Sequence, residues 1–368
     1  MINLKNLSAD RVAQFPDHFG KYQEPWEGFP HILKTQQFSR EMIERLIFED
    51  TMKTLFHWKN RSLISYLRDG RVGVVTYFFE PSTRTRMSFE RAVQSLGASV
   101  IHTESGAVFS SSAKGETLAD TVRVVSGVGA GIGYGDLLII RHPQDYAVEE
   151  AAKFSRTPVI NAGDGKHQHP TQAFLDLATI YLRYGKIDGL SIALVGDIQF
   201  SRTIRSLCYL LSKFDDVKIY LVSPEEISIK EDIKEHLTEK NVWFREEADL
   251  NSVLPHIDVA YFTRLQAERF RDQEELCQQL KKKIPLYSLT EKNLDLVPQQ
   301  AIVTHPLPIG DNEIVEKIKT DPRIWAFIQS DIGVATRMAL INRIFKELGK
   351  LNMHQNFKEL VFSGLGWK

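Results

Sequence analysis

Arginine and hydroxyl side chains gather directly after the apolar runs of this 368-residue chain. The densest group is Ser82–Arg86, with the sequence STRTR, which follows the run 72–79 and leads straight into a helical pattern. The free N–H groups and the positive dipole end of a helix N-terminus attract anions. The hydroxyls add donors, and the Arg84 guanidinium adds a planar fork suited to phosphate. The segment therefore predicts a phosphate site, and a capped helix with solvated arginines is the alternative for this segment alone.

Five further apolar runs also end in polar groups. The polar residues are Arg141 after the run 137–140, His169 after 158–160, Arg202 after 190–195, Arg264 and Gln266 after 257–262, and His305 after 301–303. In open parallel sheets, ligands bind at the carboxyl ends of the strands. One arginine cluster binds one phosphate, so the additional arginines suggest a second anion such as a carboxylate.

His169 stands at the start of a helical pattern, directly before Pro170. One interpretation is a donor to a carbonyl oxygen, which acyl-like transfer requires. An ordinary helix-start histidine is the alternative. His167 and His169 do not have the H-E-x-x-H spacing of a zinc site, and no cysteine lies nearby. We therefore expect no metal site at these histidines.

Short β-branched runs alternate along the chain with longer amphipathic stretches. The runs are 72–79, 137–140, 158–160, 190–195, 217–222, 257–262 and 301–303, and the helical patterns are 88–96, 171–184 and 338–351. This alternation predicts βαβ units and an α/β fold with doubly wound parallel sheets. Gly185 suits a helix C-cap, and a new strand begins at Leu190, so a domain boundary is expected near 184–189.

Composition excludes several classes of protein. Lys and Arg number 46 against 47 Asp and Glu, so the net charge of −1 gives no electrostatic footprint for nucleic acid. Cys208 and Cys277 are too few for a disulfide framework, which favours a reduced, cytoplasmic setting. No apolar run approaches the ~18 residues that span a bilayer. Residues 1–30 show no secretory-signal pattern, and we expect an extension that is packed loosely on the first domain or is partly disordered.

Several motifs in order identify a family resemblance. These are FFEPSTRTR at 78–86, RHP at 141–143, NAGDG at 161–165, HPTQ at 169–172, TRLQAER at 263–269 and HPLP at 305–308. From about residue 31 to the last helix, the chain resembles the aspartate/ornithine transcarbamylases. It is more similar to the aspartate type, because ornithine-type members carry a cysteine in both the H-P-x-Q and the H-x-L-P segments.

The resemblance implies two domains that bind different substrates. A carbamoyl-phosphate domain would occupy 1–184, preceded by the extension and completed by the helix 336–368, and an amino-acid domain would occupy 185–335. The implied catalytic residues are Arg84, Thr85, Lys114, Arg141 and His169. The implied substrate-binding residues are Ser82, Thr83, Ser110, Gln172, Arg202, Arg264, Gln266, Pro306 and Leu307.

The resemblance also implies a reaction and an assembly. Carbamoyl phosphate would transfer its carbamoyl group to L-aspartate in de novo pyrimidine biosynthesis, without a cofactor. Ser110 and Lys114 match the loop that reaches into a neighbouring subunit's site, which implies a homotrimer with shared sites, and further regulatory or pathway subunits are conceivable partners. The alternative for residues 110–114 is a polar surface loop.

One departure from the family pattern bears on the acceptor. Arginine usually follows H-P-L-P, whereas Ile309 follows it here. The function of a transcarbamylase with another amine acceptor therefore stays open. A second alternative, from a different class of protein, is a catalytically silent homologue that serves in an assembly. The glycine-rich segment 127–135 is expected to be a flexible connection.

Overall fold

The computed structural model describes residues 31–59, 72–103, 115–129, 133–265, 270, 272–310 and 312–350. The chain divides into two units. Of the described residues, the N-terminal unit holds 31–37, Glu41–Thr171 and 333–350, and the C-terminal unit holds Phe38–Arg40 and Gln172–Ile332. The predicted domain limits at 184/185 and 335/336 remain predictions, and the predicted extension 1–30 lies outside the described residues.

The N-terminal unit is built on a four-stranded parallel sheet in the order β2-β1-β3-β4. Its strands are β1 (Gly73–Phe78), β2 (Ser99–Thr103), β3 (Leu137–His142) and β4 (Val159–Asp164). β4 is buried along its whole length, and β1 and β3 are buried over most of theirs. Burial on both faces of a parallel sheet requires near-continuous apolar runs, which is why these strands stood out in the sequence.

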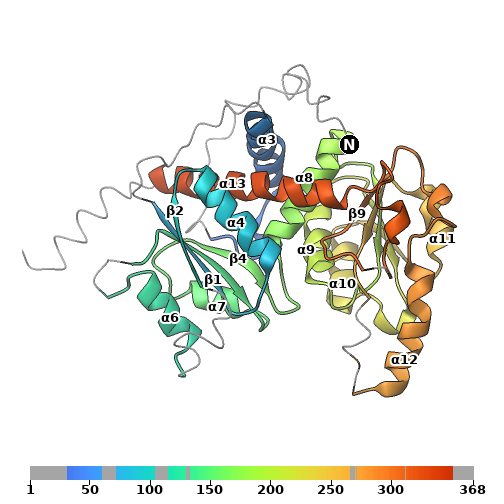
Figure 1. Cartoon of the computed structure of the whole chain (residues 1–368), viewed down its shortest axis with the longest axis horizontal. Helices are drawn as coiled ribbons and strands as arrows, with labels where there is room; N and C mark the ends of the chain where they lie inside the picture. Colours follow the sequence, from blue (N-terminus) through green and yellow to red (C-terminus); the bar gives the residue numbers. More distant parts are fainter. Residues whose placement is uncertain are drawn as a thin grey trace, which may run out of the picture. The chain divides into compact units, whose positions relative to one another are not determined.

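Helices cover both faces of this sheet (Figure 1). α4 (Thr83–Ser95) lies on one face, and α6 (Leu118–Val125) and α7 (Ala147–Ala152) lie on the other. This arrangement follows from right-handed crossovers whose direction reverses after β2. The unit also contains η2 (Thr35–Gln37), α2 (Arg40–Glu44, whose first residue belongs to the other unit), η3 (Arg45–Thr51) and α3 (Met52–Lys59).

A long final helix, α13 (Ala326–Lys350), ends in the N-terminal unit. Arg337 lies over the Phe89 ring of α4 at 4.9 Å. Arg343 donates its Nε to Asp50 at 2.9 Å, and both side chains are largely buried. Breaking a buried ion pair of this kind typically costs about 3–5 kcal/mol. The helix predicted at 338–351 is present, but it begins at Ala326.

The C-terminal unit contains a five-stranded parallel sheet in the order β7-β6-β5-β8-β9. Its strands are β5 (Ser191–Val195), β6 (Lys218–Val222), β7 (Trp243–Glu247), β8 (Val259–Phe262) and β9 (Ile302–Thr304). Its α-helices are α8 (Pro170–Tyr184, which begins in the other unit), α9 (Arg202–Leu211), α10 (Glu231–Glu239), α11 (Leu250–Val253) and α12 (Glu274–Lys283). Short 3-10 turns complete it at η5 (Glu225–Ile227), η6 (Leu254–His256), η8 (Ile284–Tyr287), η9 (Leu294–Leu296) and η10 (Glu316–Ile318). The predicted α/β class with two doubly wound parallel sheets is confirmed.

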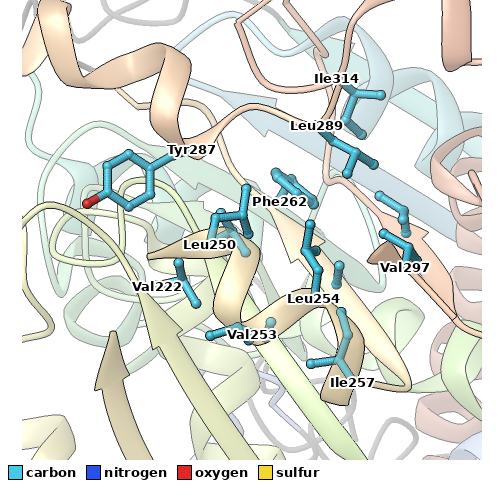
Figure 2. Close-up of a cluster of buried hydrophobic side chains, with 14 of the residues drawn as sticks. Val222, Leu250, Val253, Leu254, Ile257, Phe262, Tyr287, Leu289, Val297 and Ile314 are labelled. Carbon is cyan, nitrogen blue, oxygen red and sulfur yellow. The ribbon is translucent and has the colours of Figure 1, made fainter. Parts of the chain in front are cut away.

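An apolar core supports one face of this second sheet. Figure 2 shows side chains of α11, β8 and the segments around Leu289, Val297 and Ile314 gathered in it. Ile309 is partly buried and packs against this core. The core fixes the chain that follows β8 and β9, where two of the predicted site segments lie.

The glycine-rich segment has a packing role in its described part. A Cβ at Gly133 would lie 2.8 Å from the backbone of Ser126, so only glycine allows the chain to pass the end of α6 here. Residues 130–132 lie outside the described residues. The chain is closely packed at Gly133, and the flexible connection expected for the whole segment remains a prediction.

His31 gives the N-terminal unit a pH-dependent stability. Its Nδ1 accepts the Val159 backbone N–H at 3.0 Å, and burial lowers the pKa of His31 from 6.5 to about 4. Between these values the unfolded chain binds the proton and the folded chain does not, so protonation favours unfolding. We expect the free energy of unfolding to fall by up to about 3 kcal/mol as the pH drops through this window. Denaturation of wild type and His31→Gln across it should give a shallower pH slope for the variant, and equal slopes would contradict the assignment.

Among the helices of the described residues, none has the length and apolar character needed to cross a membrane.

Candidate active site

The N-terminal sheet has its topological switch point between β1 and β3, because the chain moves from β1 to β2 in one direction and then returns to β3 on the other side. Ligands of doubly wound folds bind in the crevice at such a point, beyond the carboxyl ends of the strands. Phe78 of β1 pairs with Arg141 of β3, and Phe79 N–H donates to the Arg141 carbonyl at 2.9 Å. The segment that leads into α4 therefore starts beside Arg141.

The N-terminus of α4 presents hydrogen-bond donors that a ligand could use. Ser82 occupies the N-cap position but makes no capping hydrogen bond. Thr83 and Arg84 are exposed, and Thr85 is buried. Among the described residues, these four side chains have no hydrogen-bond or ion-pair partner. The first backbone N–H groups of a helix also lack an intrahelical acceptor, so the whole turn presents donors suited to a phosphate.

Arg141 is held in place by two acceptors. Its Nη2 pairs with Glu80 at 2.6 Å, and its Nη1 donates to the Ala162 carbonyl at 3.2 Å. Glu80 follows β1 and Ala162 lies in β4, so the guanidinium of Arg141 contacts the two strands that flank β3. A charged side chain fixed in this way is preorganised for a substrate oxygen.

His169 follows a tightly bonded turn at the end of β4. Asp164 Oδ1 accepts Asn161 Nδ2 at 2.9 Å and the Gln168 backbone N–H at 3.0 Å. His169 is 4% exposed, and its Nδ1 lies 3.5 Å from the Thr171 hydroxyl at the start of α8. The turn fixes the imidazole at the same sheet edge as the α4 N-terminus, because β4 is the neighbour of β3.

His167 has a structural environment. Its Nδ1 lies 3.2 Å from Asp164, its Nε2 lies 3.7 Å from Glu149, and its ring stacks on Tyr146 at 3.9 Å. No cluster of three or more histidine, cysteine or acidic side chains in the described part of the chain could hold a metal ion.

The C-terminal sheet has its own switch point between β5 and β8. Arg202 is the first residue of α9, after β5, and Arg264 is an exposed residue two positions after the end of β8. The two strands are paired, with Val195 opposite Phe262. The two arginines therefore follow strands, as the sequence predicted, and the structure shows that these strands are adjacent.

Gly196 allows the ends of these two strands to approach closely. Its φ is +110°, and a Cβ there would lie 2.1 Å from the Thr263 carbonyl oxygen. Thr263 in turn donates its backbone N–H and its hydroxyl to the Val195 carbonyl at 2.8 and 3.0 Å. The backbone that carries Arg264 is thereby tied to the end of β5.

The segment after β9 is also ordered by hydrogen bonds. The Leu307 N–H donates to His305 Nδ1 at 2.8 Å, and the His305 N–H donates to Gln329 Oε1 at 2.8 Å. Leu307 has φ +60° and the Leu307-Pro308 peptide is cis. A left-handed leucine persists only where its surroundings hold it. Pro306 and Leu307 thus form a fixed turn beyond the sheet.

The departure at Ile309 has a physical explanation. Its side chain packs against the apolar core of the C-terminal unit, and the following Gly310 N–H donates to the buried carboxylate of Glu313 at 2.5 Å. The isoleucine therefore serves packing, and in the described part of this sheet edge Arg202 and Arg264 follow β5 and β8.

Three predicted site residues, Ser110, Lys114 and Gln266, lie outside the described residues. The N-terminal unit brings Ser82, Thr83, Arg84, Thr85, Arg141 and His169 to one sheet edge, and the C-terminal unit contains Gln172, Arg202, Arg264, Pro306 and Leu307. Sequence reasoning missed Asp176 and Gln329, which hold Gln172 and His305. Asp176 could have been noticed as an acidic residue inside an otherwise apolar helical face.

The fold and the site define an α/β protein with two doubly wound units, each presenting cations at the carboxyl ends of its strands. Residues 30–182 match the family model described as aspartate/ornithine carbamoyltransferase, carbamoyl-P binding domain. Residues 188–344 match the model described as aspartate/ornithine carbamoyltransferase, Asp/Orn binding domain. The chain belongs to the aspartate/ornithine carbamoyltransferase family.

Relatives and solved structures agree with this assignment. The chain is 44% identical to the chloroplastic aspartate carbamoyltransferase of Arabidopsis thaliana, over 84% of this chain and 76% of that protein. The aspartate carbamoyltransferase catalytic subunit of Methanocaldococcus jannaschii is 39% identical over 86% of this chain and 98% of its own length. A structure of the M. jannaschii catalytic subunit aligns with a TM-score of 0.77, at 38% identity, covering 87% of this chain and 99% of that one. A Trypanosoma cruzi aspartate transcarbamoylase in complex with carbamoyl phosphate and aspartate aligns at 0.76, with 33% identity over 84% and 94% of the two chains.

Proposed function

We propose that this protein transfers the carbamoyl group of carbamoyl phosphate to the amine of L-aspartate and releases N-carbamoyl-L-aspartate and phosphate. The observation that carries the proposal is the pair of anion sites. The α4 N-terminus offers unused donors and the Arg84 cation, and Arg202 and Arg264 follow adjacent strands at a second switch point. A phosphate and a dicarboxylate are the two anions that this reaction brings together.

The carbamoyl-phosphate half of the reaction falls to the N-terminal unit. Ser82, Thr83 and Arg84 bind the phosphate through the helix N-terminus, and Lys114 adds charge from a neighbouring subunit. Arg141, Thr85 and His169 donate to the carbamoyl oxygen, which becomes an oxyanion when the amine attacks. The backbone of Pro306 and Leu307 lies over the reacting carbon.

The acceptor half falls mainly to Arg202, Arg264 and Gln266, which bind the two carboxylates of aspartate. The amine of aspartate attacks the carbamoyl carbon, the bond from that carbon to the phosphate oxygen breaks, and the departing phosphate accepts the amine proton. No side-chain base is then needed. Most of the rate enhancement comes from holding two anions in register and excluding water.

Three wider features belong to the same proposal. Ser110 and Lys114 complete the site of a neighbouring subunit, so the active form is a homotrimer. The product N-carbamoyl-L-aspartate places the enzyme in de novo pyrimidine biosynthesis. Its setting is the cytoplasm, which the two reduced cysteines, Cys208 and Cys277, favour.

The test is phosphate release from carbamoyl phosphate by the purified protein, with L-aspartate and L-ornithine supplied in separate reactions. We expect turnover with aspartate and none with ornithine. N-(phosphonacetyl)-L-aspartate, which is bound in a structure of the T. cruzi relative, should inhibit competitively against carbamoyl phosphate. Turnover with ornithine alone, or no turnover with aspartate, would overturn the proposal.

A further inference from the structure

A buried carboxylate connects two separate parts of the candidate site. Asp176 lies within α8 and is 1% exposed. Its Oδ1 accepts the Gln172 Nε2 amide at 2.8 Å and the Gln329 Nε2 amide at 2.5 Å. All three residues belong to the C-terminal unit. A buried carboxylate is costly unless it is satisfied, so its presence in an apolar helix face calls for a reason beyond packing.

The first branch of this network orients Gln172. Because its Nε2 donates to Asp176, the amide is fixed with its carbonyl oxygen as the remaining polar end. A carbonyl oxygen accepts N–H groups, and the carbamoyl group carries an NH₂. The orientation that Asp176 imposes is therefore the one that recognises the carbamoyl amide.

The second branch runs to the backbone of the 305–308 turn. Gln329 lies in the first turns of α13, and its Oε1 accepts the His305 N–H at 2.8 Å. His305 Nδ1 then accepts the Leu307 N–H at 2.8 Å, so the proton of the neutral ring sits on Nε2. The chain of contacts thus reaches the left-handed Leu307, whose φ is +60°.

We propose that Asp176 is a positioning residue, which fixes the Gln172 amide and, through Gln329 and His305, the Pro306–Leu307 backbone in one register around the carbamoyl group. The inference rests on the proposed function. A displacement of about 1 Å in positioning groups can cost about 100-fold in rate, which is the scale on which such a network matters. Asp176 itself touches no substrate.

Tyr261 and His305 are titratable groups that adjoin this network within the described residues. Tyr261 of β8 faces Asp176, and burial together with the Asp176 charge raises the pKa of Tyr261 well above its ordinary value. His305 after β9 is the next group along the network. Tyr261 therefore stays neutral through the range in which the enzyme is assayed.

The substitution Gln329→Glu tests the network through pH. It keeps the size of the side chain and places a second carboxylate against Asp176, so one of the two must carry a proton to restore the contact. We expect kcat to be about 10- to 100-fold below wild type at pH 8.5, with the deficit shrinking steadily toward pH 6, because positioning effects have this scale. The binding of inorganic phosphate, which needs only the N-terminal unit, should change less than about 3-fold, because it does not depend on this register.

Two variants serve as comparisons. Gln278→Glu makes the same change beside Glu274, 3.3 Å away on the exposed face of α12, and should leave kcat unchanged at every pH. Gln329→Met keeps the length but makes neither hydrogen bond, so its kcat deficit should not vary with pH. Thermal unfolding of each protein at both pH values identifies the folded samples, and if Gln329→Glu unfolds at pH 8.5 the comparison is made between pH 6 and 7.5.

The outcomes separate the inference from the proposed function. Wild-type protein without carbamoyl transfer to aspartate would overturn the function. An active wild type with a folded Gln329→Glu variant whose kcat ratio is flat with pH, or equal to one, would overturn the positioning role alone. An unaltered kcat in folded Gln329→Met would overturn it as well.

Discussion

Replacing Arg84 with alanine should reduce kcat/KM for carbamoyl phosphate by about 100- to 1,000-fold, because each hydrogen bond to a charged group is worth about 1.5–3 kcal/mol and a guanidinium can make two. Arg84 is exposed at the first turn of α4, where the helix N-terminus already favours an anion. Losing the guanidinium would leave the phosphate with the backbone and hydroxyl donors of the α4 N-terminus and the Lys114 charge proposed from a neighbouring subunit. Initial rates of phosphate release against carbamoyl phosphate concentration measure the loss.

The fold should be insensitive to the same change. Arg84 has no hydrogen-bond or ion-pair partner among the described residues, so its removal breaks no contact in that part of the chain. Arg91→Ala is the matched control, since Arg91 is an exposed arginine two turns along the same helix and lies over Trp58 at 5.0 Å. If Arg84→Ala and Arg91→Ala had equal kinetics, the phosphate site could not lie at the α4 N-terminus.

The buried strands were predictable because their burial leaves a mark on the sequence. The seven predicted apolar runs correspond to strands β1, β3, β4, β5, β6, β8 and β9. The two strands that were missed, β2 and β7, each lie at one edge of their sheet and are mostly exposed, whereas the opposite edge strands, β4 and β9, are buried. With one edge and much of their faces in water, the segments SVIHT and WFREE need no continuous apolar run, so periodicity could not find them.

The placement of site residues was predictable for a related reason. Parallel strands bring their carboxyl ends to one edge, so residues that follow different strands meet without any knowledge of the strand order. Arg141, next to the end of β1, and Arg264, next to the end of β5, illustrate this. Glu80 as the partner of Arg141 depends on side-chain geometry, which strand ends alone do not specify.

The network around Asp176 could not be derived in this way. Asp176 and Gln329 are 153 residues apart, and their hydrogen bond carries no periodic signal. Gln329 also lies upstream of residue 338, where the sequence predicts that the final helix begins. In the structure this helix begins at Ala326. The role of Ile309 was hidden for the same reason, because only the packed core shows which way an apolar side chain turns.

Replacing Arg264 with alanine should weaken the acceptor half of the reaction and leave the donor half intact. A charge-assisted pair between a guanidinium and a carboxylate is bidentate, and losing one typically costs about 2–5 kcal/mol. We therefore expect kcat/KM for aspartate to fall by about 100-fold or more, because about 1.4 kcal/mol corresponds to tenfold. The affinity for inorganic phosphate should stay within about 2-fold, since the ligands proposed for phosphate do not include Arg264 and sites without shared partners act independently.

Two further variants show whether the effect belongs to this position. Arg264→Lys keeps the charge but not the planar fork, so it should recover only part of the lost activity. Arg245→Ala removes an exposed arginine from β7, where it pairs with Glu247 and lies over Tyr220, and should behave as wild type. If Arg264→Ala instead weakened phosphate binding and left the KM for aspartate unchanged, the second switch point would not be the acceptor site. The carboxylates would then have to bind elsewhere, because Arg264 follows Thr263, which is tied to the end of β5, and Arg202 begins the helix that follows the same strand.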